Sequence, residues 1–306
     1  MKKAIITGPT GVVGIALVEY LIKQNVAVTA VCRSGSKRIS RLPKSESLTI
    51  IECDLTELSK LSEMIDEEQD VFYHLAWDGT FGDARNATAV QVQNIQYTLD
   101  AVEAAAKLGC KRFVGAGSQA EYGRVEGMLD AMTPVFPENG YGMAKLCAGQ
   151  MSRLRCEQLG IEHVWTRILS VYGPGDGEKT LVSSLIRKFL SGEVPACTKG
   201  EQIWDYLYSK DAARALYLLG DKGGHGKTYC IGSGDAESLA DYIRVIRDIV
   251  NPDMEIGFGE IPYSEKQVMH LCADIEELRQ DTGFAPQYTF EQGIVETVDW
   301  IKGSDK

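Results

Sequence analysis

The sequence AIITGPTGVVG at residues 4–14 decides the fold. Ala4–Thr7 is short and apolar, which predicts a buried β-strand, and Ile15–Ile22 has the apolar spacing of a helix. Three glycines separate the two elements. A strand, a glycine-rich turn and a helix in this order predict dinucleotide binding, because the helix N-terminus presents unpaired N–H groups to phosphates.

The three glycines have separate expected roles. Gly8 permits a tight turn, Gly11 lets the backbone approach a pyrophosphate, and Gly14 lets the helix pack closely against the strand. A glycine-rich turn that binds no ligand has the same composition, so the assignment depends on the rest of the chain.

A second buried strand, Val26–Val31, bears on the choice of dinucleotide. Where NAD is bound, an acid at the end of this strand hydrogen-bonds the ribose 2′-hydroxyl. Here Arg33 and Ser34 follow instead, with Lys37 and Arg38 nearby, and these side chains suit a 2′-phosphate. The pattern favours NADP(H) as the cofactor, with NAD(H) as the alternative. A solvated basic loop would have the same sequence.

Strand and helix patterns alternate as far as residue 172, which predicts an α/β fold with a doubly wound parallel sheet, a Rossmann fold. The further expected strands are Leu48–Glu52, Asp70–Ala76, Lys111–Ala116 and Glu162–Ile168, and the further expected helices are Thr56–Ile65, Ala87–Leu108 and Tyr141–Leu159. Residues 1–172 should form a dinucleotide-binding domain, to which segments around 201–232 return. Residues 173–306 should form mainly a smaller C-terminal substrate-binding lobe, with helices at Leu181–Leu190, Asp211–Leu219, Leu239–Val250, Asp274–Thr282 and Phe290–Ile301.

Composition limits the possible functions. The chain has 306 residues, 44% of them hydrophobic and 25% charged, as in a soluble globular protein. A formal net charge of −11 argues against a nucleic-acid partner, which requires a clustered basic face. The eight cysteines form no CxxC pair and the four histidines lack ligand spacing, so neither disulfides nor a metal site are expected. No apolar run is long enough to span a bilayer, and we expect a cytoplasmic protein without a membrane partner.

Tyr141 and Lys145 form the most suggestive pair of polar residues. Four residues apart, they share one face of the expected helix. An ammonium beside a phenol favours the phenolate, so the tyrosine can exchange protons nearer neutral pH than its reference pKa of about 10 allows. Taken alone, the same spacing fits an ordinary amphipathic helix.

Further motifs connect these pieces. They are Cys53-Asp54-Leu55, His74-Leu75-Ala76, Asn94, Gly117-Ser118, Arg167 with Val171-Tyr172-Gly173-Pro174, and Trp204-Asp205-Tyr206-Leu207-Tyr208. Together with the glycine turn and the Tyr141 pair, they resemble the extended short-chain dehydrogenase/reductase family over nearly the whole chain. Within it, the chain is similar to the NAD-dependent epimerase/dehydratase branch of nucleotide-sugar enzymes.

The resemblance implies a role for each matching position. Tyr141 would be the general acid/base, Lys145 would hold the nicotinamide ribose, and Ser118 would hydrogen-bond the reacting oxygen. The implied cofactor contacts are Gly8, Thr10, Gly11, Val12, Val13, Gly14, Arg33, Ser34, Asp54, Leu55, Leu75, Ala76, Trp77, Asn94, Tyr141, Lys145 and Ile168. The implied substrate contacts are Asp78, Gln119, Ser170, Trp204 and Lys266. His74 is expected to be a packed strand residue, and Arg167 suits either a structural ion pair or a substrate contact.

Departures from the family pattern narrow the reaction. The 4,6-dehydratases carry Thr-Asp-Glu at the Ser118 position, whereas Gln119 and Ala120 follow here, which disfavours water elimination. Many relatives hold the substrate diphosphate with an arginine at the Trp204 position and with another before a Gln-Val-Met-like run, where only Lys266 is near. A nucleotide-linked sugar remains the expected substrate, held differently, unless the substrate lacks the diphosphate.

These observations support three functions. The first is an NADPH-dependent reductase of a 4-keto (6-deoxy) sugar on a nucleotide carrier, and the alternative is a 4-epimerase that retains its NAD. The third, from another class, is a non-catalytic cofactor-sensing scaffold. The resemblance also implies a homodimer formed through Ala87–Leu108 and Tyr141–Leu159.

Overall fold

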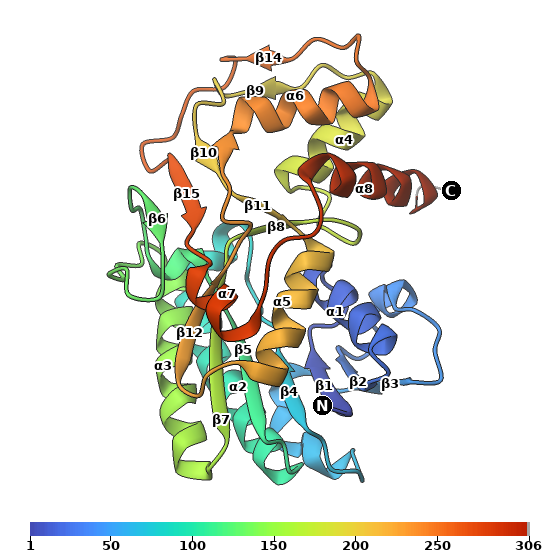
Figure 1. The fold of residues 1–306 in the computed structure, drawn as a ribbon, viewed down its shortest axis with the longest axis vertical. Coiled ribbons are helices and arrows are strands. Elements are labelled where there is room, and N and C mark those ends of the chain that lie inside the picture. Colours follow the sequence, from blue (N-terminus) through green and yellow to red (C-terminus); the bar gives the residue numbers. More distant parts are fainter. Residues whose placement is uncertain (305–306) are drawn as a thin grey trace.

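A seven-stranded parallel sheet forms the centre of the computed structural model, which describes residues 1–304 (Figure 1). Its strand order is β12-β7-β5-β4-β1-β2-β3. The bounds are β1 Lys3–Thr7, β2 Ala27–Cys32, β3 Leu48–Glu52, β4 Val71–His74, β5 Arg112–Ser118, β7 Glu162–Ile168 and β12 Lys227–Ile231. The predicted doubly wound sheet is therefore confirmed.

The strand order reverses at β1, which pairs with β2 on one side and with β4 on the other. In open α/β sheets, ligands bind at such a switch point, beyond the carboxyl ends of the strands. The glycine turn follows β1 there, and residues 75–77 follow β4 at the same edge.

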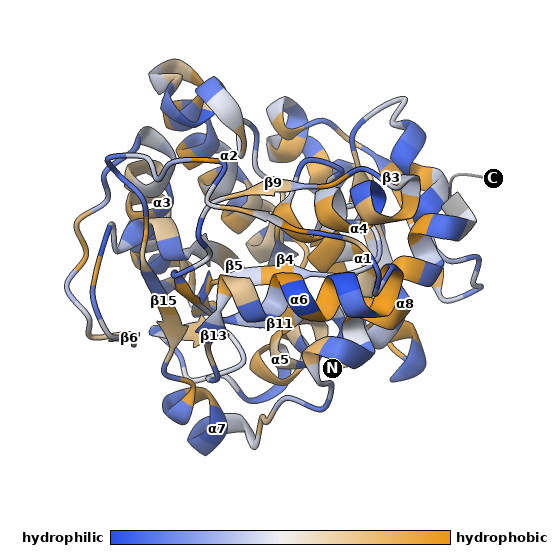
Figure 2. Ribbon diagram, turned by 90° about the horizontal axis from the view of Figure 1, so that it is seen from above, coloured by the Kyte–Doolittle hydropathy of each residue, from blue (hydrophilic) through white to orange (hydrophobic). Residues whose placement is uncertain are grey.

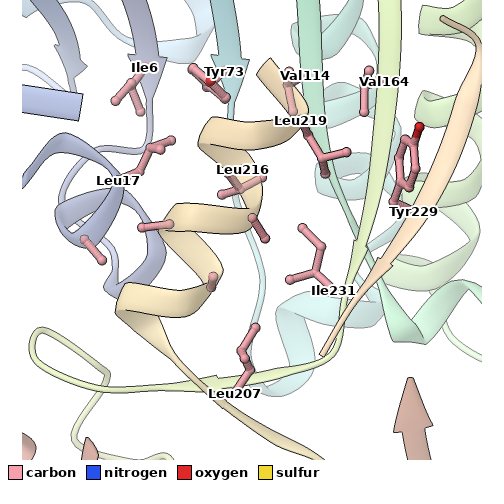
Figure 3. Packing of buried hydrophobic residues seen from close by; sticks show 14 of the residues in the cluster. Ile6, Leu17, Tyr73, Val114, Val164, Leu207, Leu216, Leu219, Tyr229 and Ile231 are labelled. Carbon is pink, nitrogen blue, oxygen red and sulfur yellow. The ribbon is translucent and has the colours of Figure 1, made fainter. Parts of the chain in front are cut away.

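Helices cover both faces of the sheet. On one face, α1 (Val12–Lys23) packs beside α5 (Ser209–Lys222), and Figure 3 shows Leu17 and Leu216 from these two helices against the sheet. The other face is covered by α2 (Thr88–Lys107), α3 (Gly140–Leu159) and the 3₁₀ segment η2 (Leu55–Glu63). Burial on both faces explains why the strands read as continuous apolar runs.

The prediction of an α-helix at Thr56–Ile65 was wrong in type. The segment is the 3₁₀-helix η2, and Asp54 occupies its N-cap position without a side-chain cap. Leu55, Leu58 and Leu61 are spaced by three, which matches the three residues per turn of a 3₁₀-helix and places one apolar row inward. Leu58 and Leu61 are fully buried.

The rest of the chain surrounds a second core. Here α4 (Leu181–Ser191), α6 (Leu239–Val250) and α8 (Phe290–Ser304) pack together, and Figure 2 shows apolar and polar stretches alternating along α6 and α8. A short helix, α7 (Glu276–Thr282), lies against α5. The small strands are β6 Met128–Leu129, β8 Ser170–Tyr172, β9 Ala196–Cys197, β10 Ile203–Trp204, β11 Tyr206–Tyr208, β13 Glu237–Ser238, β14 Gly257–Phe258 and β15 His270–Ala273. The remaining 3₁₀ segments are η1 Lys37–Arg41, η3 Gly82–Asn86 and η4 Gln119–Glu121.

Three small sheets join these strands within residues 1–304. Their orders are β13-β10-β15-β6, β11-β8 and β14-β9. The pairing of β8 with β11 holds residues 170–172 beside 206–208, next to the carboxyl end of β7. From the segment 201–232, α5 and β12 lie with the large sheet, while the division of the chain at residue 172 stays a prediction.

Candidate active site

The turn after β1 is shaped by its glycines. Gly8 has a φ of +71°, and a Cβ there would lie 2.8 Å from the backbone nitrogen of Ala76. A Cβ on Gly14 would lie 2.2 Å from the carbonyl oxygen of Gly8, so α1 begins pressed against the turn itself. A Cβ on Gly11 would meet only that same oxygen, at 3.8 Å. Gly8 and Gly14 therefore allow close contacts between backbone segments, and Gly11 leaves room for a ligand.

An outer cleft of about 880 Å³ opens from this turn. It lies across the carboxyl ends of β1, β2, β3 and β4, as the switch point requires. The predicted contacts that line it are Gly8, Thr10, Gly11, Arg33, Ser34, Asp54, Leu55, Leu75, Ala76, Trp77 and Asp78. These residues come from four successive β-to-helix connections and fit a dinucleotide.

The rim of the outer cleft carries both basic and acidic side chains. Arg33, Lys37 and Arg38 line it. The carboxylate of Asp54 accepts a hydrogen bond of 3.0 Å from the Ser34 N–H, and that of Glu52 accepts one of 2.7 Å from the Gly35 N–H. Two acids from the end of β3 thus hold the backbone of the basic loop, and the loop's own side chains line the cleft.

An inner cleft of about 450 Å³ adjoins the first and shares Leu75, Trp77 and Thr80 with it. The structure brings Ser118, Tyr141 and Lys145 together in its lining. Other predicted contacts in the lining are Val12, Val13, Ile168, Ser170 and Trp204. Lys145 is the only lysine or arginine among the described residues that line this cleft.

The position of Tyr141 follows from the start of α3. The Asn139 side chain caps the helix by accepting from the Gly142 N–H at 2.9 Å. A Cβ on Gly142 would lie 2.2 Å from the carbonyl oxygen of Ala120, so only glycine allows this approach. The helix therefore begins against η4, which places Tyr141 near Ser118 at the end of β5.

Ser118 is fixed by a buried ion pair behind it. Its N–H donates to the carboxylate of Glu121 at 2.8 Å, and its hydroxyl accepts from the Ala120 N–H. Glu121 is fully buried and also accepts from Arg167 at 2.9 Å and from the indole of Trp165 at 3.0 Å. Arg167 therefore makes a structural ion pair. The groups that donate to Glu121 all belong to buried residues of the protein itself.

Lys145 is 3% exposed and has two contacts. Its ammonium donates to the carbonyl oxygen of Ala116 at 2.5 Å and lies 3.8 Å from the ring centroid of Trp77. Burial lowers the pKa of Lys145 to about 7, with Glu121 opposing the shift. The lysine is consequently near its titration midpoint at neutral pH.

The Tyr141 phenol experiences opposing influences. Burial raises its pKa, a hydrogen bond with Ser118 and the charge of Arg85 lower it, and Glu121 raises it again. The Lys145 ammonium lies 5.8 Å from the centroid of the Tyr141 ring, and the Arg85 guanidinium carbon lies 4.3 Å from it. Arg85 is the nearer cation.

Several predicted contacts lie elsewhere than in the two linings. Asn94 is buried and exchanges hydrogen bonds with the backbone of Asp78, so it holds the loop after β4. Gln119 is partly buried in η4. The pKa of Glu138 is lowered mainly by a hydrogen bond from Arg124 and less by the charge of Lys266, which places Lys266 near that surface pair.

His74 is a packed strand residue, as predicted. It is 3% exposed, and its Nδ1 lies 2.9 Å from the hydroxyl of Thr7. Burial lowers its pKa to about 3. The imidazole is therefore neutral and part of the sheet.

The sequence analysis missed three side chains of the site. Arg85 stacks on Tyr141 from η3, whereas Asp176 and Tyr206 line the inner cleft. Burial raises the pKa of Asp176 to about 6, against hydrogen bonds from Thr180 and the Gly177 N–H. The available signals were the position of Asp176 after the Tyr172-Gly173-Pro174 motif and that of Tyr206 in the motif that begins at Trp204.

Within residues 1–304, no group of three His, Cys, Asp or Glu side chains could hold a metal ion. All eight cysteines are free thiols. None of the described helices has the length and apolar character needed to cross a membrane.

Comparison with known proteins identifies the family. The model of the NAD dependent epimerase/dehydratase family matches residues 4–232, which include the glycine turn, Ser118, Tyr141 and Lys145. The chain belongs to this family. The predicted resemblance is confirmed, and the chain is an enzyme of this NAD-dependent family.

Similar proteins match over almost the whole chain. The dTDP-glucose 4,6-dehydratase of Escherichia coli is 26% identical over 336 residues, which cover 97% of this chain and 93% of the relative. Among solved structures, a UDP-N-acetylglucosamine 4-epimerase from Methanobrevibacter ruminantium M1 in complex with UDP-N-acetylmuramic acid has a TM-score of 0.89 at 25% identity, covering 99% of both chains. A UDP-glucuronic acid 4-epimerase from Bacillus cereus in complex with NAD has a TM-score of 0.85 at 23% identity and covers 99% of this chain and 100% of its own. The last of these supports the fold alone.

Proposed function

We propose that the protein is a 4-epimerase of a nucleotide-linked sugar that retains its nicotinamide cofactor. One observation carries the proposal. Ser118, Tyr141 and Lys145 line an inner cleft that adjoins the dinucleotide-shaped outer cleft. The matching family is one of epimerases and dehydratases, and a 25% identical solved structure is a 4-epimerase, which favours this function over the reductase that the sequence pattern put first.

The outer cleft fits NAD on the evidence of its own backbone. The open space at Gly11 and the free N–H groups at the start of α1 suit a pyrophosphate. Val12, Val13 and Ile168 lie in the inner cleft, where the nicotinamide end would reach Tyr141 and Lys145. A dinucleotide held there would supply the chemistry of reversible hydride transfer with the sugar carbon.

The side chains of the inner cleft manage the proton. Tyr141 would take the proton of the substrate hydroxyl and later return it to the same oxygen. Ser118 would hydrogen-bond that oxygen in both steps, because its hydroxyl already lies within reach of the phenol. Lys145 would hold the ribose of the cofactor, because its ammonium has further N–H donors beside the one that the Ala116 carbonyl accepts.

Water elimination lacks its acids in this cleft. Gln119 and Ala120 occupy the positions where the dehydratases carry Asp and Glu, and Ala120 is buried. Glu121 cannot substitute, since Ser118, Trp165 and Arg167 hold it behind the strand. Epimerisation requires no such acids, because the hydroxyl is restored in place.

The contacts that bind the substrate must differ from those of relatives that carry the two arginines. Trp204 donates its indole N–H to the Ser170 hydroxyl at 2.8 Å, and both line the inner cleft. With Tyr206 and Phe81 they give the cleft aromatic walls, against which a nucleoside base or a sugar ring can stack. We propose that stacking and neutral donors replace the missing guanidinium groups.

Reduction by NADPH is the second candidate. Arg33, Lys37 and Arg38 line the rim where a 2′-phosphate would lie, and this observation favours NADP(H) as an exchangeable coenzyme. The matching family is described as NAD dependent, which favours NAD(H) as a retained cofactor instead. Coenzyme preference and reaction type can therefore be tested together.

One assay separates the two candidates. Purified protein is incubated with UDP-glucose, UDP-N-acetylglucosamine or UDP-glucuronic acid plus NAD⁺, and NMR follows the C4 configuration of the sugar. A C4 epimer without net coenzyme reduction supports the proposal. NADPH oxidation by a 4-keto-6-deoxy nucleotide sugar, with no epimer formed, would replace it with the reductase, and no turnover with either set would contradict both.

The proposal also includes the oligomeric state, the domain division and the cellular location of the enzyme. Val92 on α2 and Met143, Met151 and Leu154 on α3 are 44–64% exposed, which suits a homodimer through these two helices. Light scattering that shows a monomer at micromolar concentration would reject it. We also propose the domain division at residue 172 and a cytoplasmic location, the latter because the thiols are unpaired.

A further inference from the structure

The loop after β4 holds an arginine against the proposed catalytic tyrosine. The Arg85 guanidinium carbon lies 4.3 Å from the centroid of the Tyr141 ring. Its Nη1 donates to the carbonyl oxygen of Thr80 at 3.0 Å, which fixes the plane of the guanidinium. Arg85 is partly buried, and it forms no ion pair within residues 1–304. Its charge therefore faces the ring without a neutralising carboxylate.

The loop that carries Arg85 is tied to α2 by one buried glutamine. The Gln91 amide donates to the carbonyl oxygens of Gly79 and Ala84, each at 2.9 Å, and its oxygen accepts from the Trp77 indole at 2.9 Å. Gly79 has a φ of +71°, which glycine adopts without strain. The conformation of this loop is thus set from α2.

The same loop is tied to the helix that bears Tyr141. The Asn86 side chain accepts from the N–H of Gly140, the residue before the tyrosine, at 3.0 Å. Arg85 and Tyr141 are consequently held in register by hydrogen bonds on both sides of their contact. Such a preorganised charge can act on the phenol without rearrangement during the reaction.

The geometry points to a positioning role for Arg85. We propose that Arg85 is the permanent cation that favours the phenolate form of Tyr141, in addition to Lys145, whose ammonium lies farther away. A cation over the ring attracts a full negative charge more strongly than it attracts the ring of a neutral phenol. The inference rests on the proposed acid/base role of Tyr141 and extends it to a residue that the YxxxK pattern does not contain.

The other charged groups near Tyr141 are consistent with this assignment. Glu121 from η4 opposes the phenolate but is paired with Arg167. Lys145 from α3 is near its titration midpoint at neutral pH, because burial lowers its pKa to about 7. A guanidinium, unlike an ammonium, is not deprotonated in proteins. A loss of charge on Lys145 would leave Arg85 as the remaining cation beside the phenol.

The test measures the ionisation of Tyr141 directly. The full chain with saturating NAD⁺ is titrated from about pH 6 to about pH 11, and the phenolate absorbance is recorded. The chain has 13 tyrosines, so each variant is compared with the same variant carrying Tyr141→Phe, and the difference reports Tyr141 alone. The variants are Arg85→Gln, Arg85→Lys and, as a matched loss of surface charge, Arg279→Gln.

Arg85→Gln should raise the pKa of Tyr141 by about one unit, the lower end of the effect of an opposite charge at this distance. Arg85→Lys should raise it less, because the charge is kept but the planar stack is lost, and Arg279→Gln should leave it unchanged. An unaltered pKa in Arg85→Gln, with folding confirmed by circular dichroism, would overturn the proposal.

The kinetic arm has a separate outcome. In Arg85→Gln the acid limb of the pH–rate profile should move to higher pH, with the rate recovered on the alkaline side. A uniform loss at all pH values would show a merely structural role and overturn the proposal. The absorbance arm uses no turnover, so a shifted Tyr141 pKa without epimerase activity would uphold the role of Arg85 and contradict the proposed function.

Discussion

The outer and inner clefts are adjacent, but they are built from different parts of the chain. The outer cleft is shaped by backbone, since Gly8 and Gly14 leave no room for a Cβ and Gly11 leaves an open space. Its lining follows four neighbouring strands in one sheet. A glycine pattern therefore describes most of this cleft.

The inner cleft is shaped by side chains from distant segments. Its walls come largely from residues 75–81, which follow β4, and from residues 168–182 and 204–206, which the pairing of β8 with β11 brings together. Several of the side chains are aromatic. Such walls can change with single substitutions while the sheet stays intact. The difference teaches that backbone geometry determines the shape of the outer cleft, whereas side chains determine that of the inner cleft.

The largest expected effect is in the inner cleft. Tyr141→Phe removes the proposed acid/base group and should lower kcat by about 10²–10⁴-fold. Because the substitution keeps the aromatic ring and leaves the lining of the outer cleft untouched, NAD⁺ affinity should change little. NMR of the sugar product and calorimetric titration with NAD⁺ measure the two quantities.

An equal loss of coenzyme binding in Tyr141→Phe would contradict the separation of the two clefts. Retained turnover would contradict the role of the tyrosine. Met143→Ala, an exposed change two residues along α3 and therefore on another face of the helix, serves as the control and should leave both quantities unchanged.

The second effect is in the backbone of the outer cleft. In Gly14→Ala the new Cβ would lie 2.2 Å from the Gly8 carbonyl oxygen, so the turn must shift, and we expect a loss of about 1–3 kcal/mol in the free energy of unfolding. Gly11→Ala should leave the melting temperature as it is, because its Cβ meets only one atom at 3.8 Å. It should nevertheless weaken NAD⁺ binding by standing where the pyrophosphate is expected.

Thermal unfolding and calorimetry of both glycine variants check this pair. Equal destabilisation in the two variants would break the distinction between a closing glycine and a ligand-facing one. Unchanged NAD⁺ affinity in Gly11→Ala would place the pyrophosphate elsewhere.

Much of the sheet could be predicted from the sequence, because buried parallel strands read as apolar runs between polar or glycine breaks. Leu48–Glu52, Glu162–Ile168 and Leu239–Val250 have the predicted bounds. The failure at η2 came from reading a spacing of three as an α-helix, where Leu58 and Leu61 pack on the 3.0-residue period instead.

Arg85 could not have been predicted from the sequence. Its contact with Tyr141 depends on a loop conformation that Gly79 permits. Gln91 on α2 holds this loop, and the Asn86 side chain joins it to Gly140 at the start of α3. None of these residues belongs to the YxxxK pattern. Side-chain contacts between loops carry no periodic signal in the sequence. The lining of the inner cleft is therefore less predictable than that of the outer cleft.

A smaller effect concerns the cost of burying Lys145 where the clefts meet. Its pKa is lowered from 10.5 to about 7 by burial, so between these values the unfolded chain binds more protons than the folded one. The free energy of unfolding of the parent should therefore rise with pH across this window. Lys145→Met lacks this slope and should be relatively most stable below pH 7.

Urea unfolding of the parent and of Lys145→Met at a series of pH values measures the difference. The advantage of the variant should shrink as the pH rises towards 10.5. Parallel stability curves for the two proteins would show that burying the charged form of Lys145 does not lower the free energy of unfolding. That result would contradict the prediction.

The smallest expected effect sharpens the comparison from the substrate side. Burial raises the pKa of Asp176 from 3.8 to about 6, so in this window the folded chain binds more protons than the unfolded one. The stability of the parent should fall as the pH rises through it. Asp176→Asn does not titrate and keeps one acceptor for Gly177 or Thr180, so its melting temperature should gain on the parent from about pH 4 to about pH 6 and then stay level.

Asp253→Asn, an exposed carboxyl change after α6, is the control for charge alone and should show no such gain. If Asp176 only shapes the fold, Asp176→Asn should alter neither NAD⁺ nor nucleotide-sugar affinity. Because its carboxylate lines the inner cleft and not the outer one, we expect weaker sugar-nucleotide binding with unchanged NAD⁺ binding. That result would show that the Asp176 carboxylate contributes to substrate recognition in the inner cleft.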